Sequence, residues 1–229
     1  MKYPILLLDA DDTLLDFKKT EAHALEATFR QYRLTYNEEI HTLYHTINHR
    51  LWRAFEEGAI TKDQILRRRF RNLFAELGIE EALTGFEEEY QRALGQGGFL
   101  LPQALEVCRE LSRDCRLYIL TNGVEATQES RLTLSGLRPY LSGVFVSETT
   151  GYQKPQREYF DYVFSRISDF DKGRALMIGD SLSSDMKGGE GAGLATCWYN
   201  PEHAPNHTDV RVDYEIQELR QLYEIARGK

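Results

Sequence analysis

Five short apolar runs, most of them separated by segments of helical periodicity, constrain the fold of this chain most strongly. The first run, residues 3–8, is apolar throughout, as is typical of a strand that a parallel sheet buries on both faces. Four comparable runs lie at 116–120, 143–146, 175–178 and 195–199. Helical patterns occur at 103–112, 125–135, 157–167 and 184–192. This alternation predicts an α/β fold with a doubly wound parallel sheet and right-handed crossovers.

One long segment interrupts the alternation directly after the first apolar run. Residues from about 18 to 96 contain no strand-like run and have the pattern of several amphipathic helices. We therefore predict a core domain formed by residues 1–16 and 99–229, with an inserted all-helical cap domain at residues 17–98. The segments 15–17 and 95–98 are suited to act as hinges between the two domains.

Composition limits the possible partners and compartments of the protein. With 229 residues, 41% hydrophobic and 28% charged, the chain can bury one good core and carry a sizeable insertion. A net charge of −8 argues against nucleic acid as a partner. The absence of a long apolar run argues against a membrane span and favours a cytoplasmic location. Cys108, Cys115 and Cys197 have no metal-ligand spacing and are expected to be buried, reduced thiols.

Polar side chains gather where the predicted strands end. Ligands of open α/β sheets bind beyond the carboxyl ends of the strands, near the point where the strand order reverses. A lysine, Lys154, lies in the loop after the third predicted strand. The other residues at these ends are Asp9, Asp11 and Asp12, then Thr121 and Asn122, then Asp180, Ser181 and Asp185.

Such a group of carboxylates would repel itself unless a cation lay among them. Oxygen ligands without nearby histidine or cysteine favour Mg²⁺ over zinc. Asp9 and Asp11 are two residues apart, so on an extended chain both carboxylates can face one substrate. One of them can attack phosphorus while the other handles the proton of the leaving group. Lys154 and the metal would offset the charge of an anionic phosphate.

Four motifs follow one another along the sheet segments. They read Leu-Leu-Leu-Asp-Ala-Asp-Asp-Thr at 6–13, Leu-Thr-Asn-Gly at 120–123, Lys-Pro at 154–155 and Ile-Gly-Asp-Ser-Leu-Ser-Ser-Asp at 178–185. This ordered set resembles the four motifs of the haloacid dehalogenase (HAD) superfamily. The resemblance covers essentially the whole predicted sheet domain, and the helical insertion matches the position of that family's cap. It implies a Rossmann-like core and a hydrolytic enzyme.

The resemblance also implies a role for each motif residue. Asp9 would be the nucleophile and a Mg²⁺ ligand. Asp11 would protonate the leaving oxygen and then activate water, while its backbone carbonyl binds the metal. Thr121 and the amide of Asn122 would hold phosphoryl oxygens, and Lys154 would neutralise the phosphate and the nucleophile.

The remaining acidic residues have supporting or non-catalytic roles in this scheme. Asp180 would complete the metal site, and Asp185 would support it near the metal waters or Lys154. Asp12 departs from the pattern, because the superfamily more often has glycine there. We expect its side chain to point away from the metal and its backbone amide to remain able to contact phosphate.

Further strings narrow the resemblance to the bacterial pyrimidine 5′-nucleotidase branch. They are Val-Ser-Glu at 146–148, Gly-Tyr-Gln-Lys-Pro at 151–155, Cys-Trp-Tyr-Asn-Pro at 197–201 and, in the cap, Arg-Arg-Phe at 68–70. The expected enzyme is a phosphoric monoester hydrolase that acts through an aspartyl-phosphate. Its expected substrate is a small phosphorylated metabolite, preferably a pyrimidine nucleoside 5′-monophosphate. The sequence does not define the oligomeric state.

Other functions compete with this interpretation. A sugar-phosphate or phosphoglycolate-type phosphatase would use the same core chemistry with different cap contacts. A haloacid dehalogenase would share Asp9 but typically lacks the second carboxylate, so Asp11 counts against it. A non-catalytic, receiver-like module also pairs acidic residues with threonine and lysine around Mg²⁺. Receivers, however, lack a large helical insertion after the first strand.

Several other patterns have simpler structural interpretations. Single aspartates such as Asp180 and Asp185 often cap helices or turns. The glycines at 188–193 do not open a helix directly after a strand, as a dinucleotide fingerprint would require. His41, His45 and His49 are expected on an exposed helical face. Most of the four arginines Arg67, Arg68, Arg69 and Arg71 are expected to be solvated. The glutamates at 87–89 are expected to form a solvated face.

Overall fold

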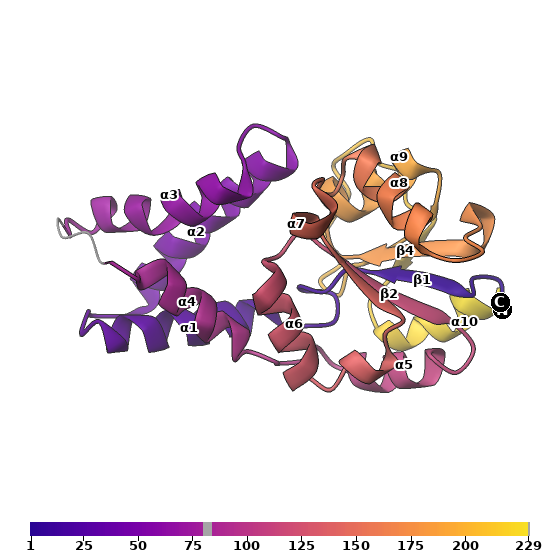
Figure 1. Cartoon of the computed structure of the whole chain (residues 1–229), viewed down its shortest axis with the longest axis horizontal. Coiled ribbons are helices and arrows are strands. Elements are labelled where there is room, and N and C mark those ends of the chain that lie inside the picture. Colours follow the sequence, from indigo (N-terminus) through magenta and orange to yellow (C-terminus); the bar gives the residue numbers. More distant parts are fainter. Residues whose placement is uncertain (80–83, 229) are drawn as a thin grey trace. The chain divides into compact units, whose positions relative to one another are not determined.

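A six-stranded parallel sheet forms the centre of the larger part of the protein (Figure 1). The computed structural model describes residues 1–79 and 84–228. The strands lie in the order β3-β2-β1-β4-β5-β6, and every adjacent pair is parallel. Their bounds are β1 Ile5–Leu8, β2 Arg116–Thr121, β3 Gly143–Val146, β4 Ala175–Gly179, β5 Ala195–Tyr199 and β6 Tyr214–Ile216. The first five are the predicted apolar runs, whereas β6 was not predicted.

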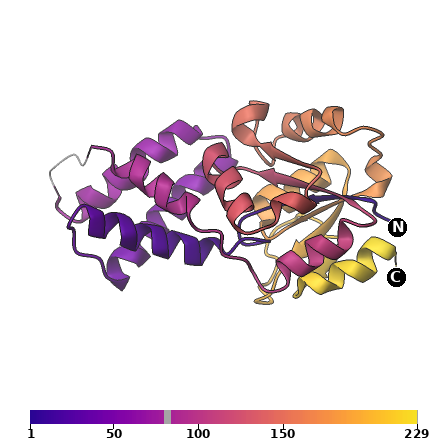
Figure 2. The same ribbon diagram turned by 60° about the horizontal axis from the view of Figure 1, so that its bottom comes forward.

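Helices cover both faces of this sheet (Figures 1 and 2). α5 and α10 lie side by side over one face, together with α6, and α8 and α9 pack over the other. Their bounds are α5 Ala104–Leu111, α6 Glu125–Leu134, α7 Ser147–Thr150, α8 Arg157–Arg166, α9 Lys187–Ala192 and α10 Leu222–Arg227. The segment predicted as one helix at 184–192 consists of a π-helical turn, Leu182–Met186, followed by α9.

The period-2 alternation of the strands divides the core into two clusters. Leu6 and Leu8 of β1 pack with Leu117 and Ile119 of β2 on the face covered by α5. Ile5 and Leu7 point to the opposite face, where they meet Tyr159 and Phe160 of α8 and other apolar side chains. Both faces are therefore buried, which explains why β1 is apolar at every position.

The chain divides into two compact units. One contains Met1–Phe17 and Gly98–Lys229, and the other contains Lys18–Gly97. The prediction of a doubly wound α/β core with an all-helical insertion after the first strand is confirmed. The helices of the insertion are α1 Phe17–Gln31, α2 Glu38–Glu56, α3 Lys62–Glu76 and α4 Phe86–Gly95.

Aromatic rings form the core of the helical insertion. Phe70 of α3 lies at its centre, with ring centroids 4.7 Å from Phe86 and 4.9 Å from Tyr90 of α4, and 5.1 Å from Tyr44 of α2. The Phe86 and Tyr90 rings meet Phe70 edge-to-face and the Tyr44 ring is stacked on it, and such pairs add specific geometry to a large apolar burial. These rings thus serve as core residues of the insertion.

Some polar side chains of the insertion are more buried than the sequence indicated. Arg69 is buried and forms a bidentate ion pair with Glu87, with its guanidinium 4.7 Å from the Tyr90 ring centroid. Arg69 is therefore an exception among arginines that were mostly expected to be solvated, and the expectation was wrong for Glu87, whose side chain is 22% exposed. Glu21 is also buried, and it accepts a hydrogen bond from Asn48 at 2.9 Å and contacts His45 at 2.8 Å.

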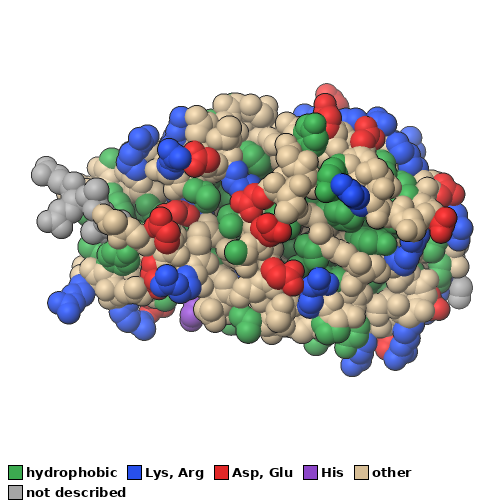
Figure 3. All heavy atoms as spheres, in the orientation of Figure 1, with side chains coloured by type: hydrophobic (Ala, Val, Ile, Leu, Met, Phe, Trp, Pro, Cys, Tyr) green, Lys and Arg blue, Asp and Glu red, His purple; other side chains and the backbone are tan. Residues whose placement is uncertain are grey.

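Charged side chains of both signs are interspersed over the visible face of the protein (Figure 3). Among the described residues, no helix combines the length and apolar character that crossing a bilayer requires. The three cysteines are buried and unbridged, as predicted.

Candidate active site

The strand order brings the predicted site residues to one edge of the sheet. The order reverses at β1, which lies between β2 and β4, and this is where doubly wound folds bind their ligands. Asp9 follows β1, and its amide donates a hydrogen bond to the Ile178 carbonyl of β4 at 2.9 Å. Thr121 ends β2 and Asp180 follows β4, so three motifs meet at this edge.

Lys154 extends from the loop after α7 into the centre of this edge. Its ammonium lies 2.5 Å from Oδ1 of Asp9, 2.7 Å from Oδ1 of Asp185 and 2.6 Å from the Leu120 carbonyl. The side chain is buried, and these three acceptors match its three N–H donors. Burial opposes the charged form, but the carboxylates of Asp185 and Asp9 outweigh it and raise the pKa of Lys154.

The Asn122 side chain holds the backbone of Lys154. Its Oδ1 accepts from the Lys154 amide and its Nδ2 donates to the Lys154 carbonyl, each at 3.0 Å. This two-point pairing joins the end of β2 to the Lys154 loop. The sequence predicts a role for the backbone amide of Asn122 only, and this side-chain contact was not predicted.

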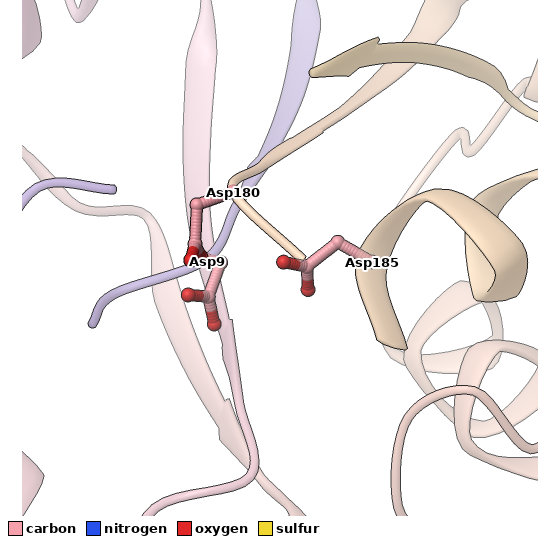
Figure 4. Close-up of side chains that lie close together, drawn as sticks. All are labelled: Asp9, Asp180 and Asp185. Carbon is pink, nitrogen blue, oxygen red and sulfur yellow. The ribbon is translucent and has the colours of Figure 1, made fainter. Parts of the chain in front are cut away.

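Three carboxylates form a cluster beside the ammonium. Asp9, Asp180 and Asp185 each contribute one oxygen, and these oxygens lie within 4.8 Å of one another. Figure 4 shows the three side chains directed toward a shared space. A set of oxygen donors at this spacing fits a hard divalent cation better than a soft one.

The charges of this cluster are not balanced by the protein alone. Burial, together with the nearby negative charges of Asp185 and Asp11, raises the pKa of Asp9 to about 8. The positive charge of Lys154 lowers this pKa but offsets only part of the rise. Burial and the charge of Asp9 likewise hold the pKa of Asp180 well above its usual range. A bound divalent cation would reverse this balance and keep the carboxylates ionised. The donor set therefore fits a metal site.

Asp185 is held by the π-helical turn that follows β4. Its Oδ2 accepts from the Ser181 amide at 3.1 Å, and its Oδ1 accepts from Lys154. The side chain lies so close to the backbone of Gly179 that a Cβ there would come within 2.2 Å of Oδ2. A glycine is therefore required at the end of β4 for Asp185 to occupy this position.

Two further residues, neither of which was predicted from the sequence, orient Asp180. The Thr13 hydroxyl donates to its Oδ1 at 3.3 Å, and the Trp198 indole donates to its backbone carbonyl at 2.7 Å. Both lie in strings that the resemblance already contained, at 6–13 and 197–201. Their position in those strings is the sequence signal that could have identified them as site residues.

Asp11 is paired with α6 rather than with Lys154. Its Oδ1 accepts from the buried Arg131 guanidinium, and its Oδ2 accepts from Gln128 Nε2 at 2.8 Å. The same Gln128 nitrogen contacts the Thr121 hydroxyl at 2.8 Å. Neither Gln128 nor Arg131 was predicted. Both are polar residues three positions apart on one helix. This spacing occurs on buried and on solvated helix faces alike, so it does not reveal the contact with Asp11.

Asp12 has a structural role at this edge. Its backbone adopts a φ of 52°, in the left-handed region that glycine enters most easily. This conformation explains why glycine suits this position. The carboxylate accepts from the Phe17 amide at 3.1 Å, and the Asp12 amide donates to the Leu15 carbonyl at 2.8 Å. The amide expected to contact phosphate thus has an internal partner.

Comparisons with known proteins agree with this architecture. The family model of haloacid dehalogenase-like hydrolases matches residues 3–193. HAD-hydrolase YfnB of Bacillus subtilis is 46% identical over 98% of this chain and 95% of its own length. Pyrimidine 5′-nucleotidase PynA of Streptococcus pneumoniae is 38% identical over 97% and 94%. Pyrimidine 5′-nucleotidase YjjG of Escherichia coli is 32% identical over 98% of each chain.

The fold also matches a solved structure over nearly its whole length. The crystal structure of YfnB bound to magnesium superposes with a TM-score of 0.93 and covers 99% of both chains. A family model over most of the chain and full-length relatives above 30% identity both indicate common descent. This chain belongs to the haloacid dehalogenase-like hydrolases.

Proposed function

We propose that this hydrolase is a Mg²⁺-dependent phosphomonoesterase that acts through an aspartyl-phosphate on Asp9. The observation that carries the proposal is the pairing of two carboxylates, Asp9 and Asp11, with different cationic partners at one sheet edge. A dehalogenase needs only the nucleophile, whereas phosphate ester cleavage also benefits from a group that moves a proton.

In the first half-reaction, a carboxylate oxygen of Asp9 attacks phosphorus and the P–O ester bond breaks. Lys154 contacts Oδ1 of Asp9 and offsets the negative charge of both the nucleophile and the phosphate. Asp11 delivers its proton to the leaving oxygen, which departs as an alcohol. Thr121 and the Asn122 amide bind phosphoryl oxygens.

In the second half-reaction, Asp11 takes a proton from water and the resulting hydroxide attacks phosphorus. The acyl-phosphate bond to Asp9 breaks, inorganic phosphate leaves, Asp9 is again a carboxylate, and Asp11 carries the proton that the next leaving group needs. The same side chain thus serves as acid and then as base, which its position two residues from the nucleophile permits.

Asp9, Asp180 and the backbone carbonyl of Asp11 would hold Mg²⁺, with Asp185 in support. A bound Mg²⁺ supplies charge neutralisation for the phosphoryl group. Within the protein, Thr13 and Trp198 orient Asp180, and the Ser181 amide orients Asp185. These contacts prepare the oxygen donors before any ion is present.

We assign pyrimidine nucleoside 5′-monophosphates as the preferred substrates. Two full-length relatives, PynA and YjjG, carry the name pyrimidine 5′-nucleotidase. The strings at 146–148, 151–155 and 197–201 support the same branch, and they lie around Lys154 and Trp198, which build the site.

An initial-rate screen tests the proposal. The panel contains UMP, dUMP, dTMP, CMP, AMP, ribose 5-phosphate, phosphoglycolate and a 2-chloro acid, each with Mg²⁺ and with excess chelator. We expect Mg²⁺-dependent phosphate release, fastest with the pyrimidine nucleotides, and none from the Asp9→Asn variant. Faster turnover of a sugar phosphate or phosphoglycolate would replace the substrate assignment. Chloride release without phosphatase activity would contradict the proposal as a whole.

A further inference from the structure

A pair of buried side chains on α6 holds both oxygens of the Asp11 carboxylate. Arg131, 1% exposed, donates from Nη1 to Oδ1, and Gln128 donates from Nε2 to Oδ2 at 2.8 Å. Arg131 Nη1 also donates to Gln128 Oε1 at 2.9 Å, so the two side chains brace each other. This arrangement fixes the direction of the carboxylate from two sides.

Burial of the Arg131 guanidinium is costly unless it is compensated. A guanidinium removed from water requires a carboxylate and further acceptors or a ring face around it. Asp11 and Gln128 provide the acceptors, and the Phe17 ring lies 5.6 Å from the guanidinium carbon. The side chain of Asp11 is itself 29% exposed, so its buried partner fixes a group that still reaches solvent.

The two carboxylates of the nucleophile motif therefore have separate cations. Lys154 contacts Asp9 and Asp185, whereas Arg131 contacts Asp11. A single shared cation would draw Asp11 toward the nucleophile. Separate cations instead give the two carboxylates partners on different elements, the loop after α7 for Asp9 and α6 for Asp11.

Gln128 connects this arrangement to the phosphate-binding hydroxyl. Its Nε2 contacts both Asp11 Oδ2 and Thr121 Oγ1, each at 2.8 Å. A Cβ on Gly123 would come within 2.8 Å of the Gln128 side chain, so the turn after β2 also limits where Gln128 can lie. The proton-transfer group and the phosphate-binding group are thus aligned by one amide.

We propose that Arg131 and Gln128 are positioning residues that align the Asp11 carboxylate for proton transfer. The inference rests on the proposed function, because it assigns Asp11 the proton-transfer role. It adds that α6, which contributes no motif residue, determines how well that role is performed. A small displacement of a reacting group is sufficient to slow a reaction strongly.

A double-mutant cycle on the full chain tests this. The variants are Arg131→Met, Asp11→Asn and their combination, assayed with UMP and Mg²⁺. Arg131→Met should lower kcat about 10- to 100-fold. It should change KM by less than about threefold, since uniform binding is not affected. In the Asp11→Asn background it should cause no further loss, because the group that it positions is already absent.

Two additional variants protect the test against misfolding. Arg131→Lys keeps the charge but not the planar fork, so it should restore part of the lost activity. Gln128→Met removes the brace and should depend on Asp11 only in part, because Gln128 also contacts the Thr121 hydroxyl. Arg138→Met is the matched control, because Arg138 forms an exposed pair with Glu129 of α6, and it should leave kcat unchanged.

The outcomes separate this inference from the proposed function. A wild-type protein without Mg²⁺-dependent phosphate release contradicts the proposed function. If the wild type is active, the positioning role alone is overturned when folded Arg131→Met keeps full activity. It is also overturned when Arg131→Lys and Gln128→Met both keep full activity. An equal loss of kcat from Arg131→Met in the wild-type and Asp11→Asn backgrounds also overturns the positioning role, because general damage to the site does not depend on Asp11.

Discussion

Asp9 and Asp11 show how two identical side chains, two residues apart, acquire different environments. Asp9 is nearly fully buried beside Lys154, and burial raises its pKa to about 8. Asp11 is partly exposed and paired with Arg131. Their separation follows from the end of β1, where the chain leaves the sheet and the two carboxylates meet different elements. The two carboxylates of one motif therefore have different partners, and a bound cation would be needed to keep Asp9 ionised as a nucleophile.

Substitution of these two residues should have unequal effects. Asp9→Asn should abolish turnover, because the amide cannot accept the phosphoryl group. Asp11→Asn should lower kcat about 10²- to 10⁴-fold, the usual contribution of general acid–base catalysis. Since we assign Asp11 to the metal through its backbone carbonyl, Asp11→Asn should retain Mg²⁺ affinity. Turnover with UMP and Mg²⁺ titration calorimetry measure the two effects.

A matched substrate pair sharpens this prediction. An aryl phosphate has a leaving group that departs readily without a proton, whereas a nucleotide releases an alcohol that needs one. The kcat/KM of Asp11→Asn should therefore fall less for the aryl phosphate than for UMP. Equal losses of Mg²⁺ affinity in Asp9→Asn and Asp11→Asn would contradict the assigned roles.

At the scale of elements, α9 illustrates why a glycine-rich segment need not bind a ligand. A Cβ on Gly188 would come within 2.5 Å of the Phe160 ring of α8, and one on Gly189 within 2.9 Å of Thr196 in β5. These glycines allow α9 to pack closely on a helix and on the sheet. Gly191 on the same helix is exposed, and a methyl group added there would have no neighbour within 4 Å among the described residues.

These contacts predict opposite effects of one substitution at two positions of α9. Gly188→Ala should lower the free energy of unfolding by about 1–3 kcal/mol, because the added methyl overpacks the contact with Phe160. Gly191→Ala should raise it by about 0.5–1 kcal/mol, because alanine has the higher helix propensity and its methyl group has room. Urea unfolding followed by circular dichroism measures both. Destabilisation by both substitutions would show that helix packing is not the deciding factor.

The elements also explain which parts of the fold and site were predictable. β1 to β5 are buried runs whose composition differs from that of the helices, so the sequence marks them directly. β6 has three residues, Tyr214–Ile216, of which only Ile216 is buried, and such a short run gives no clear signal. The candidate site aspartates were found because they follow strands. Arg131 and Arg69 were missed because a helical pattern does not reveal that an arginine is buried against a distant carboxylate.

At the scale of the whole molecule, the acidic cluster couples the site to stability. The ordinary pKa of an aspartate is 3.8, and burial raises the pKa of Asp9 to about 8 in the folded state. The pKa of Asp180 is raised in the same way. In the metal-free protein these groups bind protons more tightly when folded than when unfolded. Their contribution to stability is present below pH 3.8 and is lost as the pH rises through about 8.

Mg²⁺ should oppose this loss, because a cation that binds only the folded state stabilises it by mass action. We expect Mg²⁺ to raise the Tm relative to chelator, and to raise it more at about pH 8 than at about pH 6, where protons compete for the carboxylates. Asp180→Asn, which can keep its contact with Thr13, should reduce both the shift and its pH dependence. Thermal unfolding of the two proteins at both pH values, with Mg²⁺ and with chelator, measures this. A Tm shift of equal size in the wild type and in Asp180→Asn would show that Mg²⁺ binds outside the cluster of Asp9, Asp180 and Asp185.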